Sequence, residues 1–444
     1  MRIVLIDPND KYIGRRQSIG KVVPLLGLAY IATALKTGGH HVDVIDPLAS
    51  NMRDDAELAD AVAAGKPDLV GLTSTTPFAQ NAYRIAKLAK ESYPSARVLL
   101  GGHHASAVKD LAFDECEAID FIVIGEGEKT VVDLADQLGK GGELAKVAGL
   151  ARRADGGAVV GPDREGLDNL DRLPFPDWSL YSYDLYDKVF SPKLAKRVHV
   201  YQVLSSRGCP ADCTFCYQIF GQSYRSRSPE NVVSEIVRNS SEFGAVYFDF
   251  VDPTLTMNAK KFAGLCDGLV KAGLSKKIAW TFETRVDRVD SDILAQAVEA
   301  GAESVLFGIE SGDSFVRGKM RKKITEDEIM NAVNLADRSG LLTKASFIIG
   351  HPYESRESAF NSLKTARALR ENWSTDILAG LVGVYPDTVT WQMVETGEGG
   401  ARWREGVRGN WERSVRTDPM IEVNDLDAQA LTEILHRFQG LRNQ

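Results

Sequence analysis

Three cysteines stand close together near the middle of this 444-residue chain, at Cys209, Cys213 and Cys216. Thiolates are soft ligands that suit iron–sulfur clusters and zinc. A structural zinc ion or an ordinary four-iron cluster takes four ligands, but Cys116 and Cys266 lie far away, in segments that read as helix or loop. The spacing therefore predicts a metal centre with one open position, where chemistry can take place.

The stretch from Ser206 to Cys216, with its C-x-x-x-C-x-x-C spacing, closely resembles the cluster loop of the radical S-adenosylmethionine (SAM) enzymes. The resemblance implies a [4Fe-4S] cluster on the three cysteines, with its open iron chelated by SAM and with Phe215 packed beside the adenine. It implies cleavage of SAM by one electron to a 5′-deoxyadenosyl radical, and hence an electron donor such as flavodoxin or ferredoxin. The alternative is a zinc-binding or redox-active cysteine loop.

The length predicts two or three domains. A hydrophobic content of 44% and a charged content of 26% are normal for a soluble globular protein. The net charge of −8, without a long basic tract, disfavours nucleic acid or an anionic membrane as a partner. Five cysteines without a disulfide framework indicate a reducing compartment. With no signal-peptide pattern and no apolar run long enough to span a bilayer, we expect a cytoplasmic enzyme acting on a small molecule.

Short apolar runs alternate with helical patterns in residues 1–145. Candidate strands lie at 3–6, 41–46, 68–73, 96–100 and 121–124, and a helix is expected at 26–37. Such alternation predicts an open, doubly wound parallel sheet with helices on both faces. Ligands of these sheets bind at the carboxyl ends of the strands, where the loops here are rich in Gly, Ser and Thr.

This Rossmann-like region resembles the cobalamin-binding domain that precedes many radical SAM cores. The matching segments are 24–30, 74–77, 101–104 and 125–128, and the resemblance implies cobalamin contacts from Gly27, Ser74, Thr75, Gly101, Gly102, His103, Gly125, Glu126 and Gly127. The D-x-H-x-x-G motif of other cobalamin domains has its histidine replaced by Asn9, two residues after Asp7. We therefore expect no histidine ligand to cobalt from that position.

Two alternatives remain open for this domain. It is either a cobalamin-binding domain, or a flavodoxin-like domain that has lost its ligand or serves as a partner surface. His103 and His104 either touch the corrin or a phosphate, or they start a helix without contacting a ligand.

Residues 146–195 are interpreted as an interdomain linker, rich in proline and aromatic residues. Residues 196–395 show repeated strand–helix units, with strands expected at 198–204, 245–251, 277–282, 304–309 and 343–349. This pattern predicts a partial (β/α)6 barrel of the TIM type, whose active site lies at the carboxyl ends of the strands.

Polar residues follow several of these strands. Resemblance to the family implies SAM contacts from Asp252, Glu283, Arg285 and Glu310, the last in a G-I-E-S-G stretch. The fork of Arg285 suits a carboxylate partner. For each acid taken singly, the alternative is a helix cap or a salt bridge at the rim of the barrel.

The C-terminal segment, 396–444, is expected to contain a helix at 426–441 and to cap the substrate. Tryptophans and arginines alternate before that helix, at Arg402, Trp403, Arg404, Arg408, Trp411, Arg413 and Arg416. They form either an anion-binding patch or a solvated charged face.

Taken together, the motifs predict a cobalamin-dependent radical SAM enzyme. The favoured activity is methylation of an unactivated carbon or of a phosphorus centre. The alternatives are a radical rearrangement, cyclisation or ring contraction without methyl transfer, and a non-catalytic cobalamin- or redox-responsive binding protein.

Overall fold

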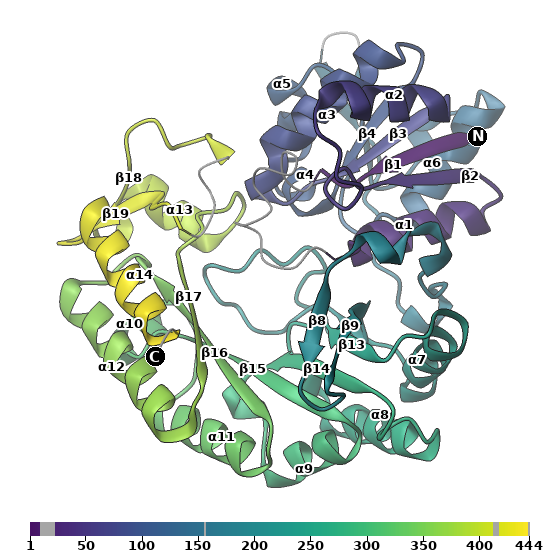
Figure 1. Cartoon of the computed structure of the whole chain (residues 1–444). Helices are drawn as coiled ribbons and strands as arrows, with labels where there is room; N and C mark the ends of the chain where they lie inside the picture. Colours follow the sequence, from purple (N-terminus) through teal and green to yellow (C-terminus); the bar gives the residue numbers. More distant parts are fainter. Residues whose placement is uncertain (9–22, 155–156, 412–416, 443–444) are drawn as a thin grey trace. The chain divides into compact units, whose positions relative to one another are not determined.

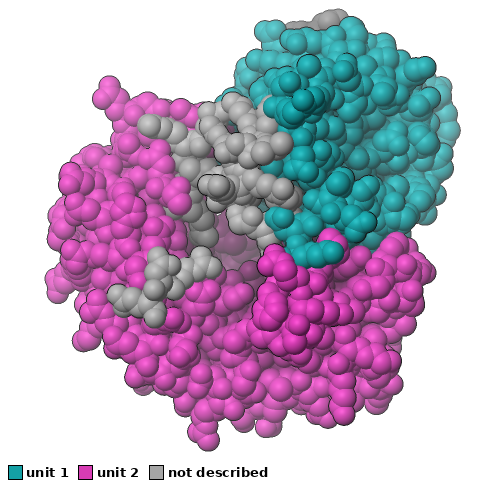
Figure 2. All heavy atoms as spheres, in the orientation of Figure 1, with its two compact units in different colours: residues 1–188 teal, residues 189–444 magenta. Residues whose placement is uncertain are grey.

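The computed structural model describes residues 1–8, 23–154, 157–411 and 417–442. The chain divides into two compact units, Met1–Lys188 and Val189–Gln444, which are coloured teal and magenta in Figure 2. The division falls inside the segment 146–195, most of which belongs to the first unit. Each unit is built around its own largely parallel sheet.

The first unit contains five parallel strands in the order β2-β1-β3-β4-β5. They are β1 (Arg2–Ile6), β2 (His41–Ile45), β3 (Leu69–Thr73), β4 (Arg97–Gly101) and β5 (Phe121–Val123). The central strands are continuous apolar runs because helices cover both of their faces. The doubly wound parallel sheet predicted from the sequence is therefore confirmed.

Two further strands lengthen this sheet from within the expected linker. β6 (Leu150–Ala154) pairs antiparallel with β5, and β7 (Gly157–Val160) pairs antiparallel with β6. Antiparallel edge strands are common on otherwise parallel sheets. The sheet is thus mixed at one edge, in a segment that was interpreted from the sequence as part of the interdomain linker.

Helices pack on both faces of the first sheet (Figure 1). They are α1 (Leu26–Thr37), α2 (Asp55–Gly65), α3 (Ala79–Ser92), α4 (Gly102–Val108), α5 (Ala112–Glu115) and α6 (Glu128–Lys140). One hydrophobic cluster joins residues of α1 and α6 to Ile3 and Leu5, which point to the same face of β1. Val4 points to the other face, where it meets Gly65 at the end of α2. The alternation of side chains along β1 therefore shows which helices cover each face of the sheet.

The second unit contains six parallel strands in the order β10-β13-β14-β15-β16-β17, as the predicted partial barrel requires. They are β10 (Tyr201–Val203), β13 (Tyr247–Phe250), β14 (Ala279–Thr284), β15 (Ala302–Glu310), β16 (Leu342–Ile349) and β17 (Asp376–Leu381). The first expected strand, 198–204, is divided in the structure. Its beginning lies in β9 (Lys196–His199), which pairs with β8 (Lys188–Ser191), and only β10 joins the barrel.

The helices of the second unit line the outside of this curved sheet (Figure 1). The main ones are α7 (Pro229–Phe243), α8 (Ala259–Lys271), α9 (Ser291–Glu299), α10 (Ser314–Lys319), α11 (Glu326–Arg338), α12 (Arg356–Trp373), α13 (Val389–Thr396) and α14 (Ala428–Arg442). The side chain of Thr325 and that of Glu328 form a capping box at the start of α11. α14 packs against β17 and α12, so the C-terminal helix completes the wall of the barrel. Within the described residues, no helix combines the length and the apolar character that crossing a bilayer requires.

Candidate functional site

The three cysteines lie on a loop that a short antiparallel pair holds at its base. β11 (Ser206–Arg207) pairs with β12 (Arg225–Ser226), and the loop runs between them. Gly208 has φ +80°, and a Cβ there would lie 2.2 Å from the carbonyl oxygen of Ser223. Only glycine combines this backbone conformation with so close an approach, so Gly208 is required for the entry into the loop.

All three thiols of the loop are free. Cys209 and Cys213 are half-buried and Cys216 is exposed. Within the described residues, no three His, Cys, Asp or Glu side chains are already arranged around a metal position. Three free thiols on one loop nevertheless match, in type and number, the ligands of a [4Fe-4S] cluster with one open iron. Cys116 and Cys266 are buried elsewhere, the latter within α8.

Thr214, between two of the cysteines, fixes the loop to the barrel. Its N–H donates to the carbonyl oxygen of Met320 at 3.1 Å, and its own carbonyl oxygen accepts from the N–H of Thr390 at 2.9 Å. Its hydroxyl lies 2.8 Å from Nε2 of His351, whose Nδ1 lies 2.7 Å from the carbonyl oxygen of Pro352. Because a carbonyl only accepts, we assign the imidazole proton to Nδ1, and Nε2 then accepts from Thr214.

His351 is fully buried, and this burial lowers its pKa to about 4. It is therefore neutral near pH 7, as its two hydrogen bonds require. No role was assigned to His351 from the sequence. Nothing in its spacing to Thr214, 137 residues earlier, signals the contact.

Asp252 follows β13 and is fully buried. Its carboxylate accepts from the N–H and hydroxyl of Ser205, at 3.0 and 2.7 Å, and from the hydroxyl of Ser206 at 2.5 Å. Burial raises the pKa of Asp252, and these hydrogen bonds lower it in part. The carboxylate predicted to contact SAM thus braces the backbone that leads into the cysteine loop.

Glu310 ends β15 at an irregular position. The register with β16 shifts between Gly308 and Glu310, and Glu310 has φ +69°. Such a bulge re-aims a side chain at the end of a strand. The buried carboxylate accepts from Nζ of Lys322 at 3.0 Å and from the hydroxyl of Ser346 at 3.3 Å. Glu310 and Lys322 therefore present a paired charge at the carboxyl edge predicted to hold SAM.

The other predicted SAM residues lie in different surroundings. Arg285 makes a two-pronged contact with Asp287, at 2.8 and 3.1 Å, so its fork is engaged within its own loop. Glu283 lies one residue before the end of β14 and is exposed. Phe215 is partly buried and packs against a hydrophobic cluster that includes Met320 and Ile348.

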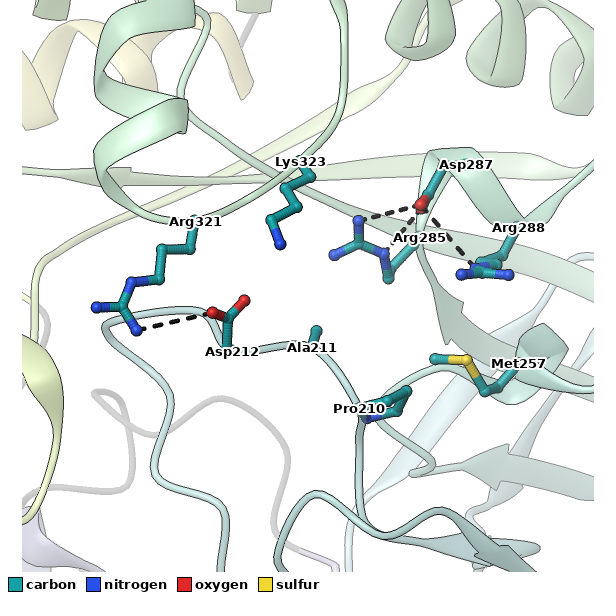
Figure 3. Close-up of a pocket in the computed structure, with 9 residues that line it drawn as sticks. All are labelled: Pro210, Ala211, Asp212, Met257, Arg285, Asp287, Arg288, Arg321 and Lys323. Atoms are coloured by element: carbon teal, nitrogen blue, oxygen red, sulfur yellow. Dashed lines mark hydrogen bonds and ion pairs between the residues drawn. The ribbon is translucent and has the colours of Figure 1, made fainter.

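A hollow of about 220 Å³ opens beside the cysteine loop (Figure 3). The loop contributes Pro210, Ala211 and Asp212 to its lining. Arg285, Arg288, Arg321 and Lys323 come from two other loops and surround it with positive charge. This hollow is not evident from the sequence, because its lining residues come from four separate segments.

The predicted cobalamin residues of the first unit also gather at a carboxyl edge. Ser74 and Thr75 follow β3, Gly101 and Gly102 join β4 to α4, and 125–127 join β5 to α6. These strands are neighbours in the sheet. Gly102 has φ +93°, and a Cβ there would lie 2.8 Å from the backbone N of Ser74, so only glycine fits where these two loops meet.

Further contacts tie these loops together. The N–H of Ser74 donates to the carbonyl oxygen of Gly101, and that of Gly125 to the hydroxyl of Ser106, both at 2.9 Å. A carboxylate oxygen of Glu126 lies 3.5 Å from the N–H of Leu167. Gly27 lies in the first turn of α1, and Gly127 immediately precedes α6.

The two adjacent histidines differ in their surroundings. His103 is exposed at the start of α4, whereas His104 is fully buried. Nε2 of His104 lies 3.0 Å from the hydroxyl of Tyr83, and its Nδ1 lies 3.3 Å from that of Thr76. The buried position and these two contacts therefore indicate a structural role for His104. Asn9, the residue at the missing histidine position, lies outside the described residues.

The basic C-terminal segment is largely neutralised by acids. Arg402 pairs with Glu422, Arg404 with Asp418 and Arg408 with Glu395, each at 2.7 Å. Trp403 belongs to β18 (Ala401–Trp403), which pairs antiparallel with β19 (Ile421–Val423), and neither strand was expected from the sequence. Arg413 and Arg416 lie outside the described residues. The described arginines thus favour the charged-face interpretation over an anion-binding patch.

Comparisons with known proteins match a family to each of the two units. The B12 binding domain family matches residues 14–135, and the radical SAM superfamily matches residues 203–366. The chain is 31% identical to an uncharacterized methyltransferase of Pyrococcus horikoshii, over 98% of this chain and 91% of that protein. It is 32% identical to the anaerobic magnesium-protoporphyrin IX monomethyl ester cyclase of Rubrivivax gelatinosus, over 85% of this chain and 67% of the cyclase.

Among solved structures, the fold is similar to that of the radical SAM methyltransferase TsrM from Kitasatospora setae. The TM-score is 0.71 at 19% identity, over 89% of this chain and 74% of that chain. The fold, the three-thiol loop and the two matched domains lead to one conclusion. The chain belongs to the radical SAM enzymes that carry a B12-binding domain, a family whose cofactors are a [4Fe-4S] cluster, SAM and cobalamin.

Proposed function

We propose that this enzyme is a cobalamin-dependent methyltransferase acting on an unactivated carbon, or on a phosphorus centre, of a small-molecule metabolite. The observation that supports the proposal is that one chain contains two candidate cofactor sites. A three-thiol loop lies at the carboxyl edge of the barrel, and glycine-rich loops gather at the carboxyl edge of the first sheet. When bound, the cluster and SAM supply a radical, and cobalamin supplies a carrier for the methyl group.

The chain's own residues have the following proposed roles. Cys209, Cys213 and Cys216 hold the cluster, while Asp252 and Thr214 hold the loop in position. Glu310, paired with Lys322, offers carboxylate oxygens to hydrogen-bond donors of SAM. In the first unit, the loops after β3, β4 and β5 would let backbone approach a bound corrin.

A second candidate is a radical rearrangement or cyclisation without methyl transfer. The observation that favours it is the 32% identity to the Rubrivivax gelatinosus cyclase, which is as high as the identity to the methyltransferase relative. The coverage favours methyl transfer, because the methyltransferase alignment spans 98% of this chain and the cyclase alignment 85%.

The fate of the SAM methyl group distinguishes the two reactions. We expect the reduced enzyme, given SAM labelled in its methyl group and a true substrate, to form S-adenosylhomocysteine and 5′-deoxyadenosine in similar amounts. The label should appear in the product, because one SAM supplies the methyl group and a second supplies the radical. Mass spectrometry of the product and both nucleosides measures this.

The controls are two cysteine variants. Cys213→Ala should abolish formation of 5′-deoxyadenosine, whereas Cys266→Ala, which removes a thiol within α8, should retain it. Substrate conversion with 5′-deoxyadenosine but without label in the product would reject methyl transfer in favour of rearrangement or cyclisation.

A further inference from the structure

The amino edge of the barrel, where its strands begin, lies opposite the carboxyl edge that carries the cysteine loop. A tight turn joins β8 to β9 there, beside β14 (Figure 1). Buried Glu303, near the start of β15, accepts from the hydroxyl of Ser191 and, at 3.1 Å, from the N–H of Lys193. Nζ of Lys193 donates to the carbonyl oxygens of Ser275 and Ile278, just before β14, at 2.8 and 2.9 Å. The hairpin is therefore anchored to this edge at two points.

Exposed apolar side chains gather at the same edge. Ser191 is buried against Glu303, so its neighbour Phe190 points to the opposite side of the strand, where it is 59% exposed. A helix that joins two parallel strands runs back to the amino edge, and exposed Val270 and Val298 lie in the last turns of α8 and α9. Exposed Leu342 begins β16. Of the seven large apolar residues that are exposed in the described part of the second unit, four thus lie at this edge.

Exposed lysines surround these apolar side chains. They end α8, precede β14 or follow the turn of the hairpin, and they are Lys196, Lys271, Lys276 and Lys277. Among the residues that the structure describes, none of the four has an acidic group in ion-pair contact. Two exposed acids, Asp267 and Glu299, lie on α8 and α9. The four lysines outnumber these acids, so the corner of the edge beside the hairpin is locally positive.

This local charge is opposite in sign to the charge of the whole chain. A net charge of −8 by itself disfavours an anionic partner. Surface charges are screened over about 8 Å at physiological ionic strength, however. A partner that touches the amino edge therefore meets its lysines, and acids elsewhere on the chain have little effect on it.

The mixture of side chains indicates the chemistry of the partner. Lysine supplies a charge on a long apolar stem, and Phe190 and Leu342 supply apolar surface that is favourable to remove from water. An anionic bilayer takes up both, because anionic headgroups lie directly above an apolar interior. A nucleic acid would engage the lysines and leave the two apolar side chains in water.

We propose that the amino edge of the barrel docks on the surface of an anionic lipid bilayer. Phe190 enters the headgroup layer from the anchored hairpin, and the lysines lie over anionic headgroups. Docking by this edge leaves the carboxyl edge of the barrel, with the cysteine loop, facing away from the lipid. The inference does not rest on the proposed function, because it uses no residue of either candidate cofactor site.

Vesicle sedimentation of the full chain, with its cluster reconstituted, tests the proposal. We expect the wild type to bind vesicles of phosphatidylcholine mixed with phosphatidylserine more tightly than vesicles of phosphatidylcholine alone. Lys276→Glu should bind the mixed vesicles at least about fivefold more weakly at low ionic strength. Phe190→Ser should also bind them about fivefold more weakly. Near 1 M salt, where the screening length falls to about 3 Å, only the effect of Phe190→Ser should remain.

Two variants elsewhere on the second unit are matched controls. Lys364→Glu makes the same charge change at an exposed lysine midway along α12. Phe315→Ser removes a phenylalanine that is likewise 59% exposed, from α10 after the carboxyl end of β15. Both should bind the mixed vesicles like the wild type, and circular dichroism checks that all four variants are folded.

Several outcomes would overturn the docking proposal. They are equal binding of the wild type to the two kinds of vesicle, wild-type binding by both Lys276→Glu and Phe190→Ser, and an equal loss of binding in the control variants. Glycerophosphoserine, the soluble headgroup, should not displace the protein from mixed vesicles at millimolar concentration. Displacement would identify a small-anion site and reject docking on a bilayer. None of these measurements involves SAM, cobalamin or a substrate, so failure here is distinct from failure of the proposed function.

Discussion

At the scale of single residues, the cysteine loop depends on partners that are remote in the sequence. Asp252 is hydrogen-bonded to Ser205 and Ser206 at the entry of the loop. His351 is hydrogen-bonded to Thr214 between the second and third cysteines. A buried hydroxyl left without its acceptor costs about 1–3 kcal/mol, whereas replacing both partners by apolar groups can be nearly neutral. His351 is thus a positioning residue.

We expect His351→Leu to lower the free energy of unfolding of the metal-free protein by about 1–3 kcal/mol, because the Thr214 hydroxyl loses its acceptor. The double variant His351→Leu, Thr214→Val should recover part of this loss. Denaturant unfolding measures the stability, and iron content after reconstitution measures the positioning of the loop. A His351→Leu protein with unchanged unfolding and full iron content would show that the contact does not hold the loop.

At the scale of secondary-structure elements, the turn after β16 contains a buried carboxyl group. Glu354 is fully buried, and one of its carboxylate oxygens accepts from the N–H of Gly350. Burial raises its pKa to about 8, so the group is protonated in the folded protein at pH 7. In the unfolded chain it ionises near its ordinary value of about 4.3.

This difference in pKa makes stability dependent on pH. A group whose pKa is raised by folding contributes stability below its unfolded value, and the contribution declines as pH rises toward the folded value of about 8. We therefore expect Glu354→Gln to be more stable than the wild type at pH 8, by up to about 5 kcal/mol, since one unit of pKa corresponds to about 1.4 kcal/mol. The amide oxygen of glutamine still accepts from Gly350 and carries no charge.

Chemical unfolding at several pH values between about 5 and 8 tests this expectation. The control is Glu357→Gln, which makes the same change at an exposed carboxylate in the first turn of α12 and should not alter the pH dependence. A constant stability difference between wild type and Glu354→Gln over this range would mean that the two states have similar pKa values.

At the scale of the whole molecule, two units with separate sheets each provide one candidate cofactor site. In the first unit, His103 is exposed at the carboxyl edge of the sheet, whereas His104 is hydrogen-bonded to Tyr83 and Thr76. Asn9 occupies the position of the histidine in the D-x-H-x-x-G motif of other cobalamin domains. The lower face of a bound cobalamin is thus expected to lack an imidazole.

We expect electron paramagnetic resonance of the cob(II)alamin form to show no nitrogen superhyperfine splitting, because no histidine stands at the ligand position. His103→Ala should give the same spectrum as the wild type. Splitting in the wild type that disappears in His103→Ala would identify His103 as the ligand and contradict the prediction. Absence of bound cobalamin in the reconstituted protein would contradict it more generally.

The sequence by itself determined the chemistry and the two architectures. The spacing of Cys209, Cys213 and Cys216, and the alternation of apolar runs with helices, are local patterns that the printed sequence contains in full. The sequence located the ends of the strands less accurately. The expected strand at 198–204 is split between β9 and β10, because pairing with β8 competes for its first half.

Only the tertiary structure decided which charged side chains meet. In the folded protein, Asp252 accepts hydrogen bonds from the serines before the loop, and His351 contacts Thr214 across 137 residues. The C-terminal arginines pair with acids. The tertiary structure also assembled the basic hollow from four separate segments of the chain. Strands and helices follow from periodicity within about ten residues, but contacts between loops depend on how the sheet brings the strand ends together, which no local pattern encodes.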